Sequence, residues 1–450
     1  MTKIVSSRRS IITAFFLLLL STGLPTPSPV IASPAADSAT TRAIVAQFCQ
    51  KLQAKAPILH TNDGVERFVA AMPPIEGWQF ARYNLVQRGA AHIIELSYSN
   101  KGANQISVTG ILINRQLRAM RATMFNDSRP DSFVSMTQTC DIIETRRIRY
   151  TVAGMARDII VRRSDGTTET LPLNPPLDPG ILAQSNRQQR ASDPIIGHID
   201  SGIDYRRRDI ADHLIVDTDG VLVAMDAWDQ DKHPFDADTA QSPFFPRRHG
   251  SYVVDILLQT TKGFQLLPVR YPRPDMARMG DIIDWMATNG ARIIMVPMGS
   301  RHRDDWRSFF AAARQHPRLL FIVSAGNNGH DIGQTPLYPA VNDLENILVV
   351  TSTLADGQLA TGSNFGRSVD IGLPAESLLA QGLDHTKTLV AGSSFAVPKL
   401  AGFAACLAAQ HNQIDVPLAT LVTTYLPAST NPDHYRFFLD DEQLAHICRR

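Results

Sequence analysis

The stretch ARIIMVPMGSRHRDDWRSFFAAARQHPRLLFIVSAGNNG, residues 291–329, contains two short apolar runs with an amphipathic segment between them. The apolar runs predict buried strands, and DDWRSFFAAARQ predicts a helix. Two strands joined through a helix pair in parallel, and a parallel sheet is covered by helices on both faces. The stretch therefore predicts an α/β fold with a mainly parallel central sheet.

The same alternation continues on both sides of this stretch. The apolar runs IIGHI, GFQLLPVRY and NILVVTSTL predict further strands, and HGSYVVDILLQ and MGDIIDWMATNG predict helices. Near the end of the chain, LVAGSSFAVPKLAGFAACLAA (389–409) predicts a buried helix. We therefore expect one parallel-sheet domain over residues 193–450, with helices on both faces of its sheet.

The chain before this domain has a different pattern. AHIIELSYS (91–99) and NQISVTGILI (104–113) predict strands, and further strands follow with a turn at Asp165–Gly166. Residues 46–172 therefore predict a smaller α+β or β-rich N-terminal domain, which is either a pro-domain or a retained accessory domain. Proline and polar residues at 173–192 predict a linker.

The N-terminus predicts export. Three basic residues precede the apolar run IITAFFLLLL (11–20), and the small residues of VIASPAA follow. This is the pattern of a signal peptide over residues 1–32, with cleavage after Ala32 and a loose leader at 33–45. An uncleaved anchor helix is the alternative. We expect a periplasmic or extracellular protein with no membrane attachment once the signal is removed.

The four cysteines fit an oxidising compartment. An even number permits two disulfides in three connectivities, and the simplest pairing joins Cys49 to Cys140 and Cys406 to Cys448. The sequence has no CxxC motif, so it does not predict a zinc ribbon. The chain carries 44 Lys+Arg and 43 Asp+Glu, a net charge of +1, which gives no support for a nucleic-acid partner.

Four ends of the predicted elements carry polar residues that a sheet does not need. Asp200 and Asn327 each follow an apolar strand, and His249 and Ser394 each open a helical stretch. Taken singly, each has an ordinary explanation as a turn or a helix cap. Together they supply the groups for attack on a carbonyl: a nucleophile, a base, a group that orients the base, and an oxyanion donor.

In this order, the four blocks resemble the subtilisin-like serine proteases (subtilases, peptidase family S8). IDSGID resembles the family's Asp block, HGSYV its His block, SAGNNG its oxyanion Asn block and GSSFAVP its Ser block. The order Asp, His, Ser is the one known for subtilisin. The resemblance covers residues 190–450 and implies a subtilisin-like fold and serine endopeptidase activity on a polypeptide substrate.

The resemblance also implies a role for each block. Asp200 would orient the imidazole of His249, His249 would take the proton of Ser394, and Ser394 would attack the scissile carbonyl. Asn327 and the Ser394 backbone N–H would bind the oxyanion. The neighbouring Ser393 is expected to play a local hydrogen-bonding role. No organic cofactor or catalytic metal is implied, and we expect a monomer.

The strand ARIIMVPMGS would line the substrate cleft, where the backbone of Met298 and Gly299 would pair with the substrate as an added strand. Three residues depart from the family pattern: Met295 replaces a usual Asn, Pro297 replaces a usual Ser, and Asp255 follows the catalytic histidine by six residues. A buried Asp255 should have a partner. If it faced the histidine instead, it would shift the pKa of that group.

Five aspartates precede the His block. They predict a solvated loop or, as the alternative, a structural calcium site, although the EF-hand spacing is absent. The five are Asp226, Asp229, Asp231, Asp236 and Asp238.

Other protease classes fit the sequence less well. The DSG at Asp200 also occurs in aspartic proteases, but that chemistry needs two facing carboxylates, and the sequence has no second DTG or DSG. An α/β-hydrolase needs GxSxG and the order Ser, Asp, His, which the sequence lacks. The remaining alternative is a non-catalytic, subtilase-like binding or inhibitory module. For an active enzyme, NRQQRAS suggests self-cleavage between about residues 180 and 193.

Overall fold

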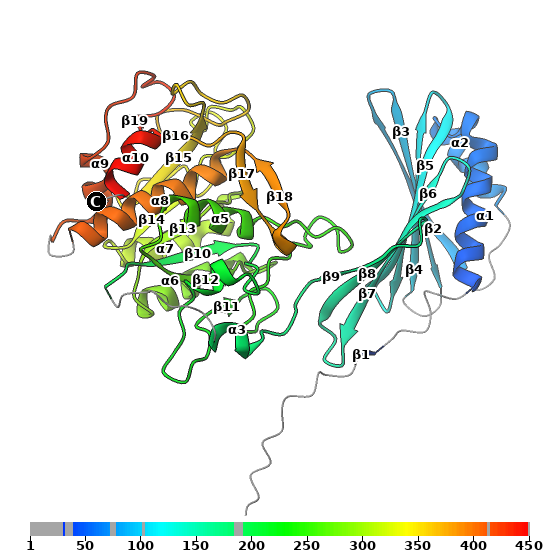
Figure 1. Cartoon of the computed structure of the whole chain (residues 1–450). Coiled ribbons are helices and arrows are strands. Elements are labelled where there is room, and N and C mark those ends of the chain that lie inside the picture. Colours follow the sequence, from blue (N-terminus) through cyan, green and yellow to red (C-terminus); the bar gives the residue numbers. More distant parts are fainter. Residues whose placement is uncertain are drawn as a thin grey trace, which may run out of the picture.

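The computed structural model describes residues 30–31, 39–72, 78–100, 104–183, 192–411 and 415–448. Most of the predicted signal peptide and part of the predicted leader and linker lie outside these residues. The described residues form an N-terminal domain and a larger C-terminal domain (Figure 1). Within them, no helix is long and apolar enough to cross a membrane.

The N-terminal domain is an antiparallel sheet with helices on one face (Figure 1). Its strands follow one another in sequence order, except that β1 (Val30–Ile31) pairs with β7. The others are β2 (Trp78–Arg88), β3 (Ala91–Asn100), β4 (Gln105–Ile113), β5 (Gln116–Asn126), β6 (Arg129–Thr137), β7 (Ile142–Thr151), β8 (Ala156–Arg163) and β9 (Thr168–Pro172). The helices are α1 (Ala39–Lys55), η1 (Ala56–Ile58) and α2 (Asn62–Ala70).

Alternating burial explains why this sheet has one covered face. In β3, Ile94, Leu96 and Tyr98 are buried while their neighbours are partly exposed, and all three pack in a core with α1. The predicted disulfide Cys49–Cys140 ties α1 to the turn after β6. The helix α1 begins at Ala39, within the predicted leader 33–45.

The C-terminal domain has the predicted parallel sheet. The strand order is β11-β12-β10-β13-β14-β15-β16-β19, and every neighbouring pair is parallel. The strands are β10 (Ile195–Asp200), β11 (Met225–Asp226), β12 (Gln265–Arg270), β13 (Ala291–Val296), β14 (Leu320–Ser324), β15 (Ile347–Thr353), β16 (Ile371–Pro374) and β19 (Phe437–Phe438). A separate hairpin joins β17 (Leu378–Gln381) and β18 (Lys387–Val390).

Helices cover both faces of this sheet, which explains the continuous apolar strands. In β13, Ile293 packs into the core that holds α5 and α8, and Ile294 packs into the core that holds α6 and α7. The helices are α3 (Pro179–Ala183), α4 (Arg208–Ala211), α5 (Gly250–Thr260), α6 (Met279–Thr288), α7 (Arg307–Gln315), α8 (Ser393–Gln410), α9 (Leu418–Thr424) and α10 (Asp441–Cys448). The short 3-10 helices are η2 (Met276–Arg278), η3 (Arg303–Trp306) and η4 (Leu383–His385).

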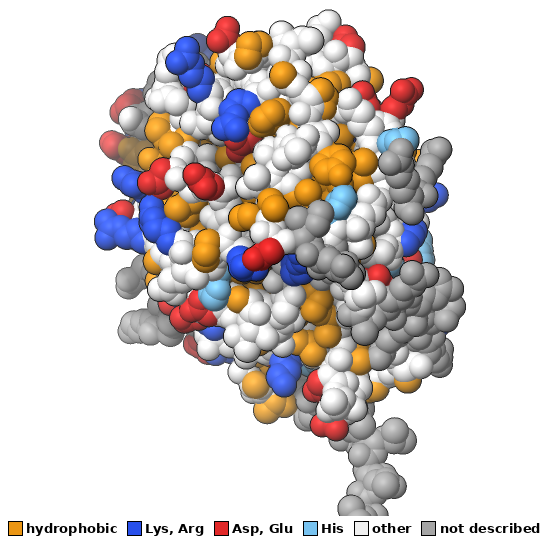
Figure 2. All heavy atoms as spheres, turned by 90° about the vertical axis from the view of Figure 1, so that its left-hand side faces the viewer, with side chains coloured by type: hydrophobic (Ala, Val, Ile, Leu, Met, Phe, Trp, Pro, Cys, Tyr) orange, Lys and Arg blue, Asp and Glu red, His pale blue; other side chains and the backbone are white. Residues whose placement is uncertain are grey.

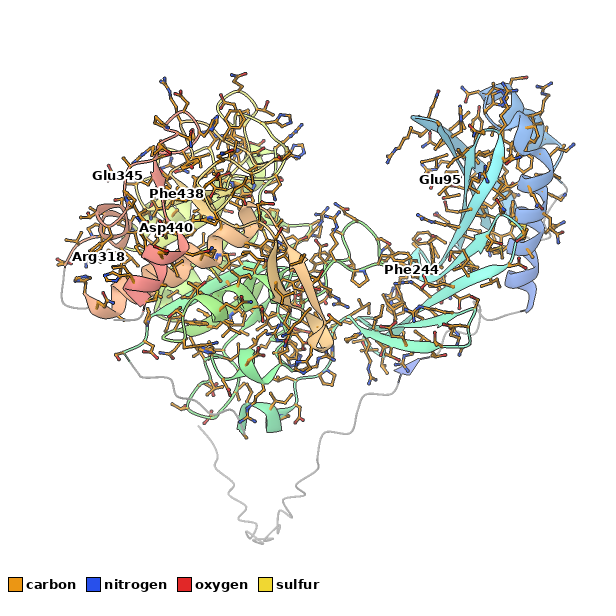
Figure 3. All side chains as sticks on the ribbon, turned by 45° about the horizontal axis from the view of Figure 1, so that its top comes forward. Glu95, Phe244, Arg318, Glu345, Phe438 and Asp440 are labelled. Carbon is orange, nitrogen blue, oxygen red and sulfur yellow. A yellow bond between two sulfur atoms is a disulfide. The ribbon has the colours of Figure 1, made fainter. Side chains whose placement is uncertain are left out.

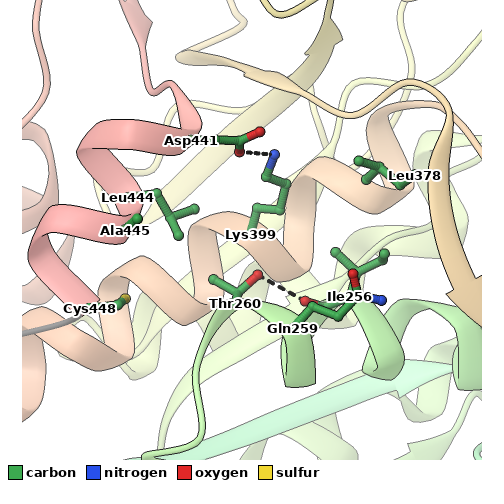
Figure 4. Close-up of a pocket in the computed structure, with 9 residues that line it drawn as sticks. All are labelled: Ile256, Gln259, Thr260, Leu378, Lys399, Asp441, Leu444, Ala445 and Cys448. Carbon is green, nitrogen blue, oxygen red and sulfur yellow. Dashed lines mark hydrogen bonds and ion pairs between the residues drawn. The ribbon is translucent and has the colours of Figure 1, made fainter.

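The last helix is fastened to α8 at several points. The second predicted disulfide, Cys406–Cys448, joins the two helices. Buried Lys399 donates to the Pro374 carbonyl at 2.6 Å and pairs with Asp441. Lys399, Asp441 and Cys448 border a pocket between α5, α8 and α10 (Figure 4). The pocket lies at the C-terminal end of α5, whereas His249 lies at its N-terminal end.

Candidate active site

The four polar residues singled out in the sequence all lie at element ends. Asp200 is the last residue of β10, and Asn327 lies three residues past the end of β14. His249 is the N-cap residue of α5, and Ser394 is the second residue of α8. Because β10 and β14 both flank β13 in a parallel sheet, their carboxyl ends lie at the same edge.

Asp200 and His249 are in direct contact. The His249 Nδ1 lies 2.9 and 2.8 Å from the two carboxylate oxygens of Asp200. A carboxylate only accepts hydrogen bonds, so Nδ1 carries the proton and Nε2 is left as the basic atom. The Ser201 N–H also donates to Asp200, at 2.6 Å, and fixes the carboxylate.

Asp200 and His249 shift each other's pKa in the directions that favour their charged forms. Burial opposes ionisation of Asp200, yet the charge and hydrogen bond of His249 hold the pKa of Asp200 below its ordinary value. Burial likewise disfavours the imidazolium, but the charge and hydrogen bond of Asp200, together with the charges of Asp236 and Asp238, raise the pKa of His249. The His249 side chain remains 34% exposed, so its other edge is accessible.

A buried carboxylate holds the start of α5. The Ser201 hydroxyl donates to Asp236 at 2.6 Å and accepts from the Gly250 N–H at 2.9 Å. Asp236 also accepts from the N–H groups of His249 and Ser251 at 3.2 and 2.8 Å. Burial raises the pKa of Asp236 despite these donors. This network joins the Asp block to the His block and fixes the backbone that carries the imidazole.

Asn327 is held by the start of α8. Its side-chain oxygen accepts from the Ser393 N–H at 2.9 Å and from the Ser393 hydroxyl at 3.0 Å. The same hydroxyl accepts from the Gly326 N–H at 3.0 Å. Ser393 therefore has a hydrogen-bonding role, and both partners of its hydroxyl lie far away in the sequence, at separations of 66 and 67 residues. Because the Asn327 oxygen is occupied, its amide N–H₂ is the end left to act as a donor.

Gly392 makes this arrangement sterically feasible. Its φ is 114°, a conformation that favours glycine. A Cβ at this position would lie 2.9 Å from both Nδ2 and Oδ1 of Asn327. No other residue type fits between the helix start and the amide without displacing one of them.

Among the described residues, no hydrogen bond joins the Ser394 hydroxyl to His249. The hydroxyl donates to the Pro297 carbonyl at 3.2 Å. The following residue, Phe395, packs its ring against the imidazole of His249 with centroids 5.6 Å apart. Among the described residues, the structure therefore brings Asp200 into contact with His249. Ser394 comes directly before Phe395, which packs on the imidazole, and makes no hydrogen bond to that ring.

Met298 and Gly299 extend the line of β13 beyond its end. Met298 is partly buried and Gly299 is exposed. Among the described residues, neither makes a backbone-to-backbone hydrogen bond. The next residue, Ser300, makes two with Tyr338, one through its N–H and one through its carbonyl. The backbone at 298–299 is thus unpaired next to Pro297, whose carbonyl accepts from Ser394.

Comparison with known proteins places the chain in a family. A sequence profile of the subtilase family, Peptidase S8, matches residues 191–431, more than half of the 450 residues. The chain belongs to the subtilase family. The match covers all four blocks and begins two residues before the expected start of the C-terminal domain.

Similar proteins share only part of their length with this subtilase. The thermophilic serine proteinase of Bacillus sp. (strain AK1) is 27% identical over 237 residues, which cover 49% of this chain and 54% of that protein. Alkaline protease 1 of Aspergillus oryzae is 33% identical over 103 residues, or 22% of this chain and 24% of that protein. The chain therefore spans about half or less of the length of these relatives.

A likeness to solved structures is weaker. The crystal structure of a cold adapted subtilisin-like serine proteinase covers 58% of this chain and 97% of that one, with 17% identity and a TM-score of 0.45. At this level the likeness adds nothing to the family assignment, which rests on the sequence profile.

The subtilase's unusual Asp255 has a partner. One of its oxygens accepts from Arg207 Nη2 at 2.6 Å, and the other accepts from Gln259 at 2.7 Å and from the Gln381 N–H at 2.9 Å. Arg207 also donates to the Gln381 carbonyl. The carboxylate thus fastens α5 to the β17–β18 hairpin and does not contact the imidazole.

Two aspartates of the acidic loop of this subtilase form ion pairs with an arginine of the same domain. Asp226 and Asp236 are fully buried, so the prediction of a solvated loop is wrong for them. Arg270 donates to Asp226 at 3.0 Å and to Asp229 at 2.7 Å. Burial raises the pKa of Asp226 to about 6. Among the described residues, no group of three or more His, Cys, Asp or Glu is arranged to hold a metal ion.

One residue beside the site was missed in the sequence. His198 is fully buried in β10, and its Nε2 lies 3.9 Å from an oxygen of Asp200. Neither ring nitrogen has a hydrogen-bond partner among the described residues. Burial lowers the pKa of His198 to about 4, so the ring stays neutral near pH 7. The only signal was a histidine inside the otherwise apolar run IIGHI.

Proposed function

We propose that this subtilase is an exported serine endopeptidase that hydrolyses peptide bonds through Asp200, His249 and Ser394. The observation that carries the proposal is the contact of Asp200 with Nδ1 of His249, at 2.8 and 2.9 Å. It leaves Nε2 as the basic atom, on a ring packed against the residue that follows Ser394.

The reaction begins with a rotation of one side chain. The Ser394 hydroxyl leaves the Pro297 carbonyl by turning about a single bond and donates to Nε2 of His249. Hydrogen bonds of this kind are often absent before substrate binds. His249 takes the proton as the oxygen attacks the substrate carbonyl, and Asp200 stabilises the imidazolium. The amine leaves with that proton, and water then hydrolyses the acyl ester.

The oxyanion has two donors in this proposal. The Asn327 amide supplies one N–H, because its oxygen is taken by Ser393. The Ser394 backbone N–H supplies the other, at the start of α8, where the helix dipole favours negative charge. Ser393 is a positioning residue, since it holds the amide without touching the substrate.

The substrate backbone would add to the segment Met298–Gly299. This segment lacks backbone partners among the described residues and continues from β13. Pro297 has no N–H, so pairing starts one residue later than it would with another residue there. We infer an extended polypeptide as the substrate.

Export and a monomeric state complete the proposal. The halolysin-like extracellular serine protease Nep of Natrialba magadii, 24% identical over 235 residues, is extracellular by name. The predicted signal peptide supports a periplasmic or extracellular location for this chain.

Acidic and basic side chains are mixed on the face shown in Figure 2, which fits the net charge of +1 and gives no support for a nucleic-acid partner. No organic cofactor enters the proposed chemistry.

One observation favours a second candidate. The Ser394 hydroxyl bonds to Pro297 and not to His249, as it would in a non-catalytic binding or inhibitory module. Cleavage of a peptide library by the purified protein, with Ser394→Ala as control, distinguishes the two. Cleavage by the wild type alone supports the protease, and no cleavage by either supports the binding module.

Self-processing between about residues 180 and 193 is part of the proposal. Intact mass measurement of the wild-type and Ser394→Ala proteins tests it. Truncation of the wild type alone is expected. Identical fragments from both proteins would show that another protease makes the cut.

A further inference from the structure

The sheet of the N-terminal domain has a second apolar area on the face that α1 and α2 do not cover. Strand register puts its members on one face: Phe133 pairs with Arg146, Arg146 with Val161, and Ile148 with Ile159. The four apolar side chains are at most 6% exposed. We call these five residues the interdomain patch.

The patch is buried by the C-terminal domain. The neighbouring β6 residues Val134 and Met136 point to the other face and join the core with α1. Phe133, in contrast, belongs to the core that contains α5 and α8 of the C-terminal domain. One hydrophobic core therefore runs across the domain boundary, as expected for a permanent contact.

The contacting element is the segment just before the catalytic histidine, residues 239–248, which we call the His249 loop. Phe244 and Phe245 place their rings 5.9 and 5.0 Å from that of Phe133. Arg146 donates to the Phe244 carbonyl at 2.9 Å, and its guanidinium lies 4.0 Å from the centre of the Phe245 ring. Figure 3 shows Phe244 reaching from the C-terminal domain to the sheet.

A second contact lies directly beside the histidine. Arg248 donates to the Pro172 carbonyl at 2.5 Å, at the end of β9, and also to the Asp236 carbonyl. The His249 loop is thus held by the N-terminal domain at Phe244 and again at Arg248. Arg248 is the residue immediately before His249, so this contact holds the backbone next to the imidazole.

The segment that follows β9 is anchored as well. Leu173 and Leu182 are buried in the same core. Asn174 donates to Asp231 at 2.8 Å, and the Tyr205 hydroxyl donates to the Pro175 carbonyl at 2.5 Å. All these anchors precede residue 184, so a cut within residues 184–191 would leave every one of them on the N-terminal fragment.

We propose that the N-terminal domain is a lasting part of the working protein, bound through the interdomain patch, and that it positions the His249 loop for catalysis. A pro-domain that inhibits and then leaves would uncover the patch and Phe244. It would also remove both holds on the His249 loop. Loss of the domain should therefore lower activity, where loss of an inhibitor would raise it.

Association is tested in the full-length Ser394→Ala protein. A recognition sequence for an unrelated protease replaces residues 184–191, and the protein is cut there after folding. Native mass spectrometry and gel filtration are expected to show both fragments in one 1:1 complex. Separation of the fragments at micromolar concentration would overturn the proposal.

Two phenylalanines provide a matched pair of variants. The two are similarly exposed, Phe245 at 42% and Phe80 at 39%. The Phe245 ring contacts Phe133 of the patch, whereas the Phe80 ring packs on Tyr98, with centroids 5.5 Å apart, within the N-terminal domain. In the cut protein, Phe245→Ala should weaken association about tenfold or more, and Phe80→Ala should leave it unchanged. Equal effects of the two changes would contradict a specific interface.

The activity test rests on the proposed protease function, while the association test does not. In the uncut protein with Ser394, Phe245→Ala should lower kcat about tenfold with little change in KM, and Phe80→Ala should change neither. A rise in activity with Phe245→Ala would identify the domain as an inhibitor. If no variant cleaves peptides, the protease proposal fails, and the association result still decides this inference.

Discussion

The ion pair of Asp255 with Arg207 should be a major support of the C-terminal domain. The Arg207 side chain is 2% exposed and that of Asp255 is 11% exposed, and they meet at 2.6 Å. Asp255→Asn keeps the shape of the side chain and removes its charge. Arg207 then keeps Asp209, whose side chain is 46% exposed, as a charged partner, and the Gln381 carbonyl as a neutral one.

The size of the effect follows from these contacts. Removing one member of a buried ion pair typically costs about 3–5 kcal/mol, and a hydrogen bond to a charged group contributes about 1.5–3 kcal/mol. Because Arg207 keeps a partially solvated charged partner, we expect Asp255→Asn to cost less than the loss of a whole buried ion pair. The free energy of unfolding should fall by about 2–3 kcal/mol. For a domain of this size, that corresponds to a fall in Tm of roughly 5–10 °C.

The assay is urea and thermal unfolding in the Ser394→Ala background, which prevents self-digestion. The matched control is Asp212→Asn, because Asp212 pairs with Arg208 at 3.3 Å and the two side chains are 28% and 51% exposed. This exposed pair should contribute less than about 1 kcal/mol. A loss below 1 kcal/mol for Asp255→Asn as well would refute the reasoning.

The same substitution tests whether Asp255 acts on His249. In protein that retains Ser394, the acid limb of the pH–rate profile should stay in place, because the Asp255 carboxylate contacts Arg207, Gln259 and Gln381. A shift of that limb to lower pH would show that Asp255 helps to raise the pKa of His249.

Three further changes probe the site and the fold. Asp200→Asn should lower kcat/KM roughly 10⁴-fold in peptide hydrolysis. It should also move the acid limb of the residual pH–rate profile to lower pH, because it removes the charge that raises the pKa of His249. Gly392→Ala should lower kcat about 100-fold or more, because its Cβ would displace the Asn327 amide. Cys448→Ser should lower the free energy of unfolding by about 4 kcal/mol in urea, since the disulfide spans 42 residues.

Each of these has a result that would count against it. An unmoved acid limb would mean that Asp200 does not set the histidine pKa. Full activity with Ala at position 392 would mean that the Asn327 amide does not act on the oxyanion. Unchanged stability of the cysteine variant would mean that α10 is held by its other contacts alone.

The local patterns of the sequence were enough to predict the parallel sheet. Strands buried on both faces read as continuous apolar runs, and the helices between them left few possible topologies. The sequence also showed that Asp200 and Asn327 each follow a strand, and in a parallel sheet the carboxyl ends of strands lie at one edge. The disulfides could be predicted because each half of the chain holds two cysteines.

The contacts that fix the site could not be predicted in the same way. Ser393 meets Asn327 across 66 residues, and Asp255 meets Arg207 across 48. Nothing in either local sequence marks the partner, because side-chain pairing across elements depends on the final packing. His198 was not recognised because it lies inside an apolar run that predicts only a buried strand.

The N-terminal domain shows the same limit. Alternation in β6 and β7 predicts strands, but it does not say which face meets another domain. The patch contains Arg146, a charged residue that reads as solvent-facing until its partners Phe244 and Phe245 are known. The second buried face of the sheet is identified only when the strand register is combined with the contacts that the His249 loop makes.

The central claim is that Ser394, and not the adjacent Ser393, is the nucleophile. A fluorophosphonate reagent applied to the folded wild-type, Ser393→Ala and Ser394→Ala proteins, with the adduct located by peptide mass spectrometry, tests it most directly. We predict one adduct, on Ser394, in the wild type, and none in Ser394→Ala, although Ser393 is still present. No adduct in the wild type, or an adduct on another serine, would contradict the account.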